Sequence, residues 1–169
     1  ASDFSSRIVI HARQNPAESD RNVTCCYVAA ANKWLIAYQH EYSIAQGRVS
    51  TIACYYHPAS LTTLNAGNNW PIPAIGIQAF TNPDLGGTTA GNTSPRAILA
   101  YQFDDTNSMA NTDHSDIWVT QIDANTEQFL SGGYAAGSAV GSMWDRENPS
   151  VNQVAGTNDG WIVAYQERR

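Results

Sequence analysis

The segments WLIAYQ (34–39), AILAYQ (97–102) and WIVAYQ (161–166) decide the fold. They share one hexamer pattern, and their tyrosines lie 63 and 64 residues apart. A pattern that returns at nearly constant spacing indicates a repeat architecture. Each hexamer carries aliphatic or aromatic residues at both odd and even positions, which is typical of a strand covered on both faces and central in its sheet. The sequence therefore predicts three similar central strands.

Turn and strand signals surround each hexamer. Residues 158–160 (Asn-Asp-Gly) form the clearest turn signal, because Asn and Gly accept positive φ. Strand-like segments precede the first and third hexamers, at 23–29 and 149–155, and follow the first and second, at 48–56 and 116–123. No segment shows a sustained helical period. We therefore expect an all-β fold of repeated antiparallel β-meander units.

The segments NPSVNQVAGTNDGWIVAYQ (148–166) and SDIWVTQIDANTEQFLSGG (115–133) resemble the blade repeats of extracellular β-propeller proteins. In those repeats a Pro-Ser/Ala-Val strand leads through a Gly turn into a strand rich in Trp, Val, Ala and Tyr. An Asp-Ile-x-Val-x-x-Ile/Val-Asp strand follows. The resemblance covers most of the chain and implies a propeller-like meander, not an activity. The chain departs from the propeller pattern in two ways. The spacing of the hexamers exceeds the roughly 40–50 residues of a usual blade. The chain also has three units, whereas the smallest propellers have about four blades.

We expect the 169 residues to form a single all-β domain of about three repeats. Unit 1 is placed at about 22–60, unit 2 at about 75–125 and a partial unit 3 at 149–169. The segment SRIVIHA (6–12) has the pattern of a third strand without its first two, so residues 1–12 are assigned as a stray strand. Because the third unit lacks a last strand, we expect this N-terminal strand to complete it, in cis or in trans. Either arrangement covers a strand edge with unpaired backbone groups.

The composition favours an extracellular binding protein. Hydrophobic residues make up 43% of the chain and charged residues only 14%, with 12 Gly and a net charge of −6. The nine Lys and Arg residues are scattered apart from the final pair, whereas a nucleic-acid-binding protein needs a concentrated basic surface. No apolar run reaches the roughly 18 residues of a membrane helix. We expect a secreted or surface-exposed protein with no nucleic acid and no membrane span. Since the chain begins with Ala1, we read it as a processed chain or a fragment.

Cysteines and two asparagines are candidates for covalent modification. A Cys26–Cys54 disulfide could join two strands, and Cys25 with Cys26 could form a strained vicinal disulfide. Free thiols that pack as small hydrophobic residues are an equal alternative. The Asn-x-Ser/Thr pattern occurs at Asn22 and Asn92, in turn-like stretches, and marks acceptor sites for N-glycosylation in a glycoprotein.

No catalytic motif is recognisable. The four histidines are not at metal spacing, and neither His-Glu-x-x-His nor Gly-x-Ser-x-Gly occurs. We therefore expect no enzyme and no catalytic residues. One acidic loop, 104–116, carries oxygen ligands of the kind that calcium takes, from Asp104, Asp105, Asp113 and Asp116. Their spacing does not match an EF-hand, which favours a solvated loop over a calcium site and predicts no cofactor.

Aromatic residues in loops, next to polar residues, are the candidate ligand contacts. An exposed ring beside amide or charged groups suits sugars, whose apolar faces stack on aromatics while their hydroxyls need donors and acceptors. Aromatic residues packed under a loop connection are the alternative. The candidate contacts are Asn68, Asn69, Trp70, Trp144, Asp145 and Arg146.

These observations together favour a non-enzymatic, lectin-like binding module that binds glycans and associates with itself. Repeated units that display several weak sites gain avidity. A structural subunit of a filament or ring, assembled by β-strand exchange through residues 6–12, is the alternative. A fragment of a larger propeller protein is a further alternative, because that architecture serves many functions.

Overall fold

The computed structural model describes residues 17–44, 47–58, 70–71, 79–104, 115–134 and 145–168. These residues are all-β apart from one 3-10 turn, η1 (Ala29–Ala31). The strands are β1 (Ser19–Val28), β2 (Lys33–Ile44), β3 (Gly47–Pro58), β4 (Trp70–Pro71), β5 (Ala79–Gly86), β6 (Arg96–Asp104), β7 (Ser115–Asp123), β8 (Gln128–Tyr134), β9 (Asp145–Gln153) and β10 (Trp161–Arg168). The expected all-β class is confirmed. The stray strand expected at residues 1–12 lies outside the described residues.

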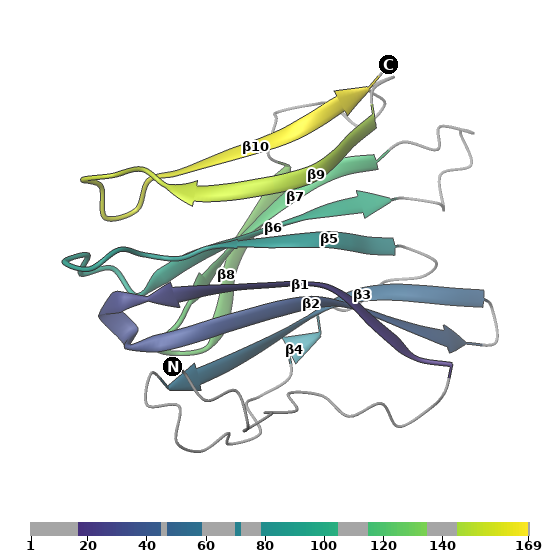
Figure 1. The fold of residues 1–169 in the computed structure, drawn as a ribbon, viewed down its shortest axis with the longest axis horizontal. Coiled ribbons are helices and arrows are strands. Elements are labelled where there is room, and N and C mark those ends of the chain that lie inside the picture. The colour runs from purple at the N-terminus through teal and green to yellow at the C-terminus, as the bar shows by residue number, and fades with distance from the viewer. Residues whose placement is uncertain are drawn as a thin grey trace, which may run out of the picture.

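Seven strands follow one another as a mostly antiparallel meander, in the order β1-β2-β3-β5-β6-β7-β8 (Figure 1). The short β4 pairs with β3, and β9 and β10 form a separate antiparallel pair. The meander has one weak junction, since β3 and β5 share a single parallel pair, Ser50 with Ala79. The described strands do not close into a ring, and none of the described residues forms a helix long and apolar enough to cross a membrane.

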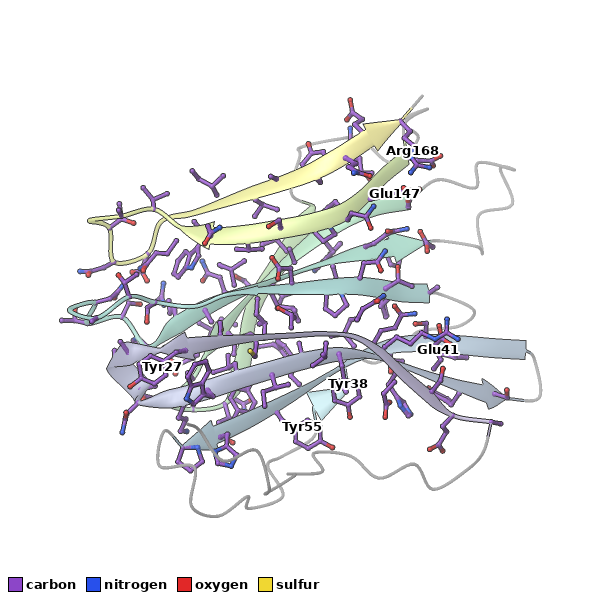
Figure 2. The ribbon with its side chains drawn as sticks, in the orientation of Figure 1. Tyr27, Tyr38, Glu41, Tyr55, Glu147 and Arg168 are labelled. Carbon is purple, nitrogen blue, oxygen red and sulfur yellow. The ribbon has the colours of Figure 1, made fainter. Side chains whose placement is uncertain are left out.

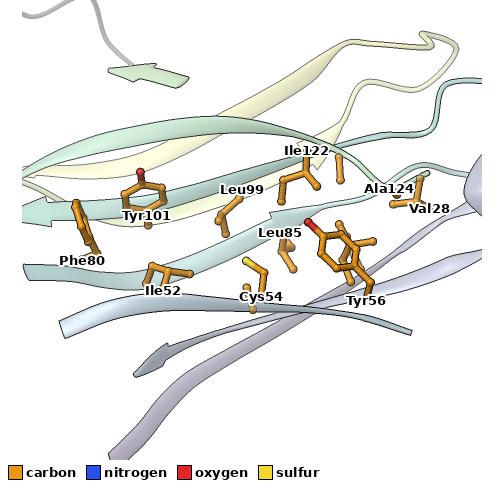
Figure 3. Packing of buried hydrophobic residues seen from close by; sticks show 14 residues of the cluster. Val28, Ile52, Cys54, Tyr56, Phe80, Leu85, Leu99, Tyr101, Ile122 and Ala124 are labelled. Carbon is orange, nitrogen blue, oxygen red and sulfur yellow. The ribbon is translucent and has the colours of Figure 1, made fainter. Parts of the chain in front are cut away.

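The weak junction divides the meander into two layers that pack face to face, β1–β3 and β5–β8. The main core cluster joins these layers, with Ile52 and Cys54 on one side and Leu99 and Ile122 on the other (Figure 3). A second cluster on the opposite face of β5–β8 packs against Val151 and Trp161 of the β9–β10 pair. The β5–β8 layer is therefore covered on both faces, and the β9–β10 layer on one.

The hexamers differ in burial according to this layering. In β6 the five residues 97–101 are all buried, as the sequence predicts for a central strand. In β10 half-buried and exposed residues alternate, and the strand has β9 as its only described neighbour. Two covered faces are thus found for the second hexamer and not for the third, because no described layer lies on the outer face of β10.

The three hexamers pair with the strand before them in the same register. In each case the second residue of the hexamer pairs with a residue of the preceding strand. The fourth residue of the hexamer pairs with the residue two positions before that one in the chain. The pairs are Leu35–Cys26 and Ala37–Thr24, Ile98–Gly86 and Ala100–Asp84, and Ile162–Asn152 and Ala164–Ser150. Side chains alternate between faces along a strand, so this register assigns equivalent residues to equivalent faces.

An asparagine in the left-handed conformation lies at a register shift in each of these pairings. The φ angles of Asn22, Asn82 and Asn148 are 49°, 48° and 53°. Each lies at an irregularity in the strand ladder. Asparagine is among the non-glycine residues that adopt this conformation most readily. The resulting bulges turn the start of β1, β5 and β9 in the same way.

Candidate functional site

Three asparagines from different layers form a row of hydrogen-bonded amides, here called the asparagine ladder (Asn22, Asn82 and Asn148). Asn22 Nδ2 donates to Asn82 Oδ1 at 2.7 Å, and Asn82 Nδ2 donates to Asn148 Oδ1 at 3.4 Å. Each amide also donates to the glutamine that ends its own hexamer, at 3.0–3.1 Å: Gln39, Gln102 and Gln166. The ladder connects the first strands of the three layers at one end of the molecule.

The ladder borders an open pocket of about 390 Å³. Its lining consists of the three asparagines and the two residues that follow each of them, Val23-Thr24, Pro83-Asp84 and Pro149-Ser150. The lining is therefore mostly polar and comes from three equivalent tripeptides. Side chains of all three layers converge on this hollow.

Asp84 lies in the middle of this lining and holds the three strands together. Its Oδ1 accepts a hydrogen bond from the Thr24 hydroxyl at 2.9 Å, and its Oδ2 accepts one from the backbone N–H of Val151 at 2.7 Å. The Thr24 hydroxyl in turn accepts from the backbone N–H of Leu85 at 3.3 Å. A carboxylate accepts through both oxygens, and charge strengthens both bonds. These contacts give the pocket a defined shape.

Two side chains of the pocket are left to meet a ligand. Val23 is 72% exposed, which is unusual for a β-branched residue within a strand. The Ser150 hydroxyl has no hydrogen-bond partner within the described ranges, although it occupies the place that Thr24 and Asp84 hold in the other layers. The pocket thus offers a hydroxyl and a small apolar surface within a polar frame.

Those sequence-predicted ligand contacts that the structure describes do not line the pocket. Asn68, Asn69 and Trp144 lie outside the described residues, and the backbone of Trp70 pairs with Cys54 in β3. The remaining two contacts, Asp145 and Arg146, belong to a polar cluster between β7, β9 and β10 rather than to the pocket.

Arg146 is buried and binds two carboxylates. Its guanidinium donates to Asp116 at 2.7 Å and to Glu167 at 2.9 Å. Burial lowers the pKa of Arg146, but the bonds to Glu167 and Asp116 outweigh it and the net shift is upward. Asp145 accepts from the backbone N–H of Ser115 at 3.4 Å. These contacts tie β9 to β7 and β10, so both residues act in the packing of the layers.

The four carboxylates of the calcium hypothesis are only partly described. Asp105 and Asp113 lie outside the described residues. Asp104 accepts from the Gln102 side chain at 3.1 Å, and Asp116 binds Arg146. Within the described ranges no three His, Cys, Asp or Glu side chains gather in a way that could hold a metal ion.

All three cysteines are free thiols, which is the alternative that the sequence left open beside a Cys26–Cys54 disulfide. Cys26 and Cys54 belong to the main core cluster, and burial raises the pKa of each to about 12. They therefore pack as small protonated hydrophobic groups. Cys25 is exposed, because it points to the opposite face of β1.

Both predicted glycosylation acceptors use their amide nitrogen in the fold. Asn22 Nδ2 donates to Gln39 and Asn82. Asn92 Nδ2 donates to the carbonyls of Thr157 and Asn158, at 3.3 and 3.0 Å. A glycan replaces one hydrogen of this nitrogen, so modification at either site would remove one of these contacts.

No protein-family model matches this chain, and no curated protein or solved structure matches it. The function must therefore be argued from the chemistry of the pocket itself.

Proposed function

We propose that β1–β3, β5–β8 and β9–β10 are three copies of one structural unit, arranged side by side like propeller blades, in a non-enzymatic extracellular module that binds polyhydroxylated, sugar-like ligands. They are called units 1, 2 and 3 from here on. The shared register and the asparagine at each register shift support the common unit. The low charge content of the sequence supports the extracellular location.

The pocket of three equivalent tripeptides is the observation that carries the binding proposal. Its amides, hydroxyls and carboxylate are the groups that sugars need, because a sugar hydroxyl donates and accepts at the same time. A small number of fixed polar groups is also what gives a ligand site its orientation and specificity. Asp84 is held by Thr24 and the Val151 N–H, and the ladder asparagines are held by one another, so together they form a fixed frame.

Within this frame, Ser150 and Val23 have the roles of direct contacts. Because no described residue bonds the Ser150 hydroxyl, it can donate to a ligand oxygen and accept from a ligand hydroxyl. The exposed side chain of Val23 offers an apolar surface against the C–H face of a sugar ring. The pocket is open, so extended glycans can enter without a conformational change.

The test is a glycan array followed by calorimetric titration of the best ligand. Ser150→Ala should weaken binding about 2–10-fold, the value of one hydrogen bond, without loss of thermal stability. Ser131→Ala is the matched control, since Ser131 is an exposed serine on β8, away from the pocket. The absence of any glycan binder, or an equal effect of the two variants, would refute the proposal.

A further inference from the structure

The outer face of unit 3 exposes a position that is covered in the two other units. Leu35 in unit 1 is buried against unit 2, and Ile98 in unit 2 is buried against unit 3. Ile162 is the equivalent residue in unit 3 by register, and it is 62% exposed. Large apolar residues in this position face the next unit wherever a next unit is present. Unit 3 thus carries a packing face with no described partner.

At the opposite end of the stack, the exposed residue belongs to the first strand of unit 1. Leu85 in unit 2 is buried against unit 1, and Val151 in unit 3 is buried against unit 2. Cys25 is the equivalent residue in unit 1, and it is exposed. The stack therefore exposes Ile162 at one end and Cys25 at the other, and the equivalents of both residues are covered in the interior contacts.

We propose that a second copy of this chain docks head to tail, with β1 of one copy placed on the outer face of β9–β10 of the other. This proposal rests on the equivalence of the three units and not on sugar binding. The contact repeats only the first-strand part of the interfaces that join units 1 and 2 and units 2 and 3, because Tyr38, the equivalent of Tyr101 and Tyr165 in those interfaces, is already buried. The two interior interfaces serve as the template for how the exposed surfaces of unit 3 and unit 1 fit together.

The hydrogen bonds of the template can be continued at the new contact. In each interior interface the ladder amide of one unit donates to the ladder amide of the next, as Asn22 does to Asn82. Among the described residues the Asn148 amide donates to Gln166 alone, so its second N–H can reach Asn22 of the second copy. The Trp161 indole donates to the Gly87 carbonyl at 3.3 Å. At the new contact, Trp34 and Gln153 hold the equivalent positions.

Side-chain volumes at the contact are also complementary. A Cβ on Gly86 would overlap the side chain of Val151, so the absence of a side chain in unit 2 makes room for a larger one in unit 3. At the new contact the equivalent pair is Asn152 and Cys25. Here the larger side chain belongs to unit 3 and the smaller one to unit 1, which again leaves room for both.

The footprint on unit 1 is confined to β1 and the start of β2. Further along the same face, the rings of Tyr38 and Tyr55 stack with centroids 5.9 Å apart and are already buried (Figure 2). The second copy therefore covers Cys25 and Trp34 but not this tyrosine pair. A head-to-tail contact of this kind closes into a ring or extends as a filament. Two copies supply six units, within the roughly four to eight blades of closed propellers, so we expect a closed dimer.

The first test is the mass of the full chain in solution, by light scattering after size exclusion. The wild type should have about twice the 18.3 kDa of one chain. Ile162→Asp should convert it to the monomer, because a charge would be buried at the contact. Leu130→Asp is the matched control, since Leu130 is also exposed but lies on β8, and it should remain dimeric.

A monomeric wild type, or equal dissociation of the two variants, would overturn the proposal. Assemblies larger than a dimer that Ile162→Asp abolishes would support the docking contact and overturn its closure into a ring. Circular dichroism of the monomeric variant shows whether it is folded.

A second test uses the native thiol of Cys25. Asn152→Cys should form an intermolecular disulfide with Cys25 when treated with oxidised glutathione, which accepts the two electrons and two protons of the thiols. A dimer should appear on a non-reducing gel and disappear when Cys25→Ser is added. Leu130→Cys, treated in the same way, should remain monomeric on the gel. Failure of this cross-link leaves the glycan titration of Ser150→Ala unaffected, so the two proposals fail separately.

Discussion

The second and third hexamers have nearly the same sequence and different surroundings. AILAYQ in β6 is buried along five consecutive residues, between β5 and β7 and between two layers. WIVAYQ in β10 has one described strand beside it and one layer against it, and its burial alternates. The hexamer pattern therefore predicts a strand that can be buried on both faces. The number of faces that are actually buried depends on the neighbouring strands and layers.

The largest expected effect is a difference between equivalent isoleucines. Ile98→Ala should lower the free energy of unfolding by about 2–5 kcal/mol, because it leaves a cavity between two layers. Ile162→Ala, at the same position of the third hexamer, should change it by less than about 0.5 kcal/mol in the monomer. Urea unfolding of both variants measures the difference. Equal losses would show that β6 and β10 do not differ in packing.

A smaller difference is expected between Asp84 and Ser150, which hold equivalent positions in β5 and β9. Asp84→Ala leaves the Thr24 hydroxyl and the Val151 N–H without their acceptor and should cost about 1–3 kcal/mol. Ser150→Ala removes no protein contact within the described ranges and should be close to neutral. Thermal unfolding of the two variants tests this, and a neutral Asp84→Ala would mean that the carboxylate does not hold the strands together.

Alanine substitutions at Gly86 and at its equivalent Asn152 should also have different effects on the free energy of unfolding, by a similar or smaller amount. Gly86→Ala places a methyl group against the Val151 side chain and should cost about 1 kcal/mol, at the lower end of overpacking, because Val151 can shift. Asn152→Ala shortens an exposed side chain and should have almost no effect on the monomer. Denaturant midpoints at equal slope provide the measurement. A stabilised Gly86→Ala would contradict the close contact of units 2 and 3.

The smallest effect concerns neighbouring cysteines on opposite faces of β1. In the folded monomer at pH 8, a thiol reagent should modify Cys25 and leave Cys26 and Cys54 unmodified, and all three should react after unfolding. The pKa of each buried thiol, about 12, lies above the ordinary value of 9.0. Their contribution to stability is therefore complete below pH 9 and is lost as the pH rises towards 12. Fast modification of all three thiols in folded protein would contradict the burial.

The fold was largely predictable from the hexamers, because alternating and continuous apolar patterns report directly on strands. The all-β class and most of the antiparallel strands of the meander follow from them. The exposure of Ile162 could not be predicted, since the sequence of β10 differs little from that of β6 and burial depends on a neighbouring layer. Likewise, Arg146 was placed at a ligand site because it follows a loop tryptophan, whereas its partners, Asp116 and Glu167, are distant in sequence.

The asparagine ladder was missed although a signal for it exists. Each ladder asparagine precedes by two positions the residue that pairs with the fourth residue of a hexamer. An alignment of the three hexamers together with the strands before them would therefore place Asn22, Asn82 and Asn148 in one column. Loops of different length between strand and hexamer obscure this alignment. The glutamines that end the hexamers were visible in the repeat, but only the structure shows that they receive the ladder amides.

The asparagine ladder has a direction. Asn22 donates to Asn82 in the following unit, and Asn82 donates in turn to Asn148 in the unit after that. A unit produced by tandem duplication of the gene would bring both halves of this link with it, and could join the row without compensating changes elsewhere.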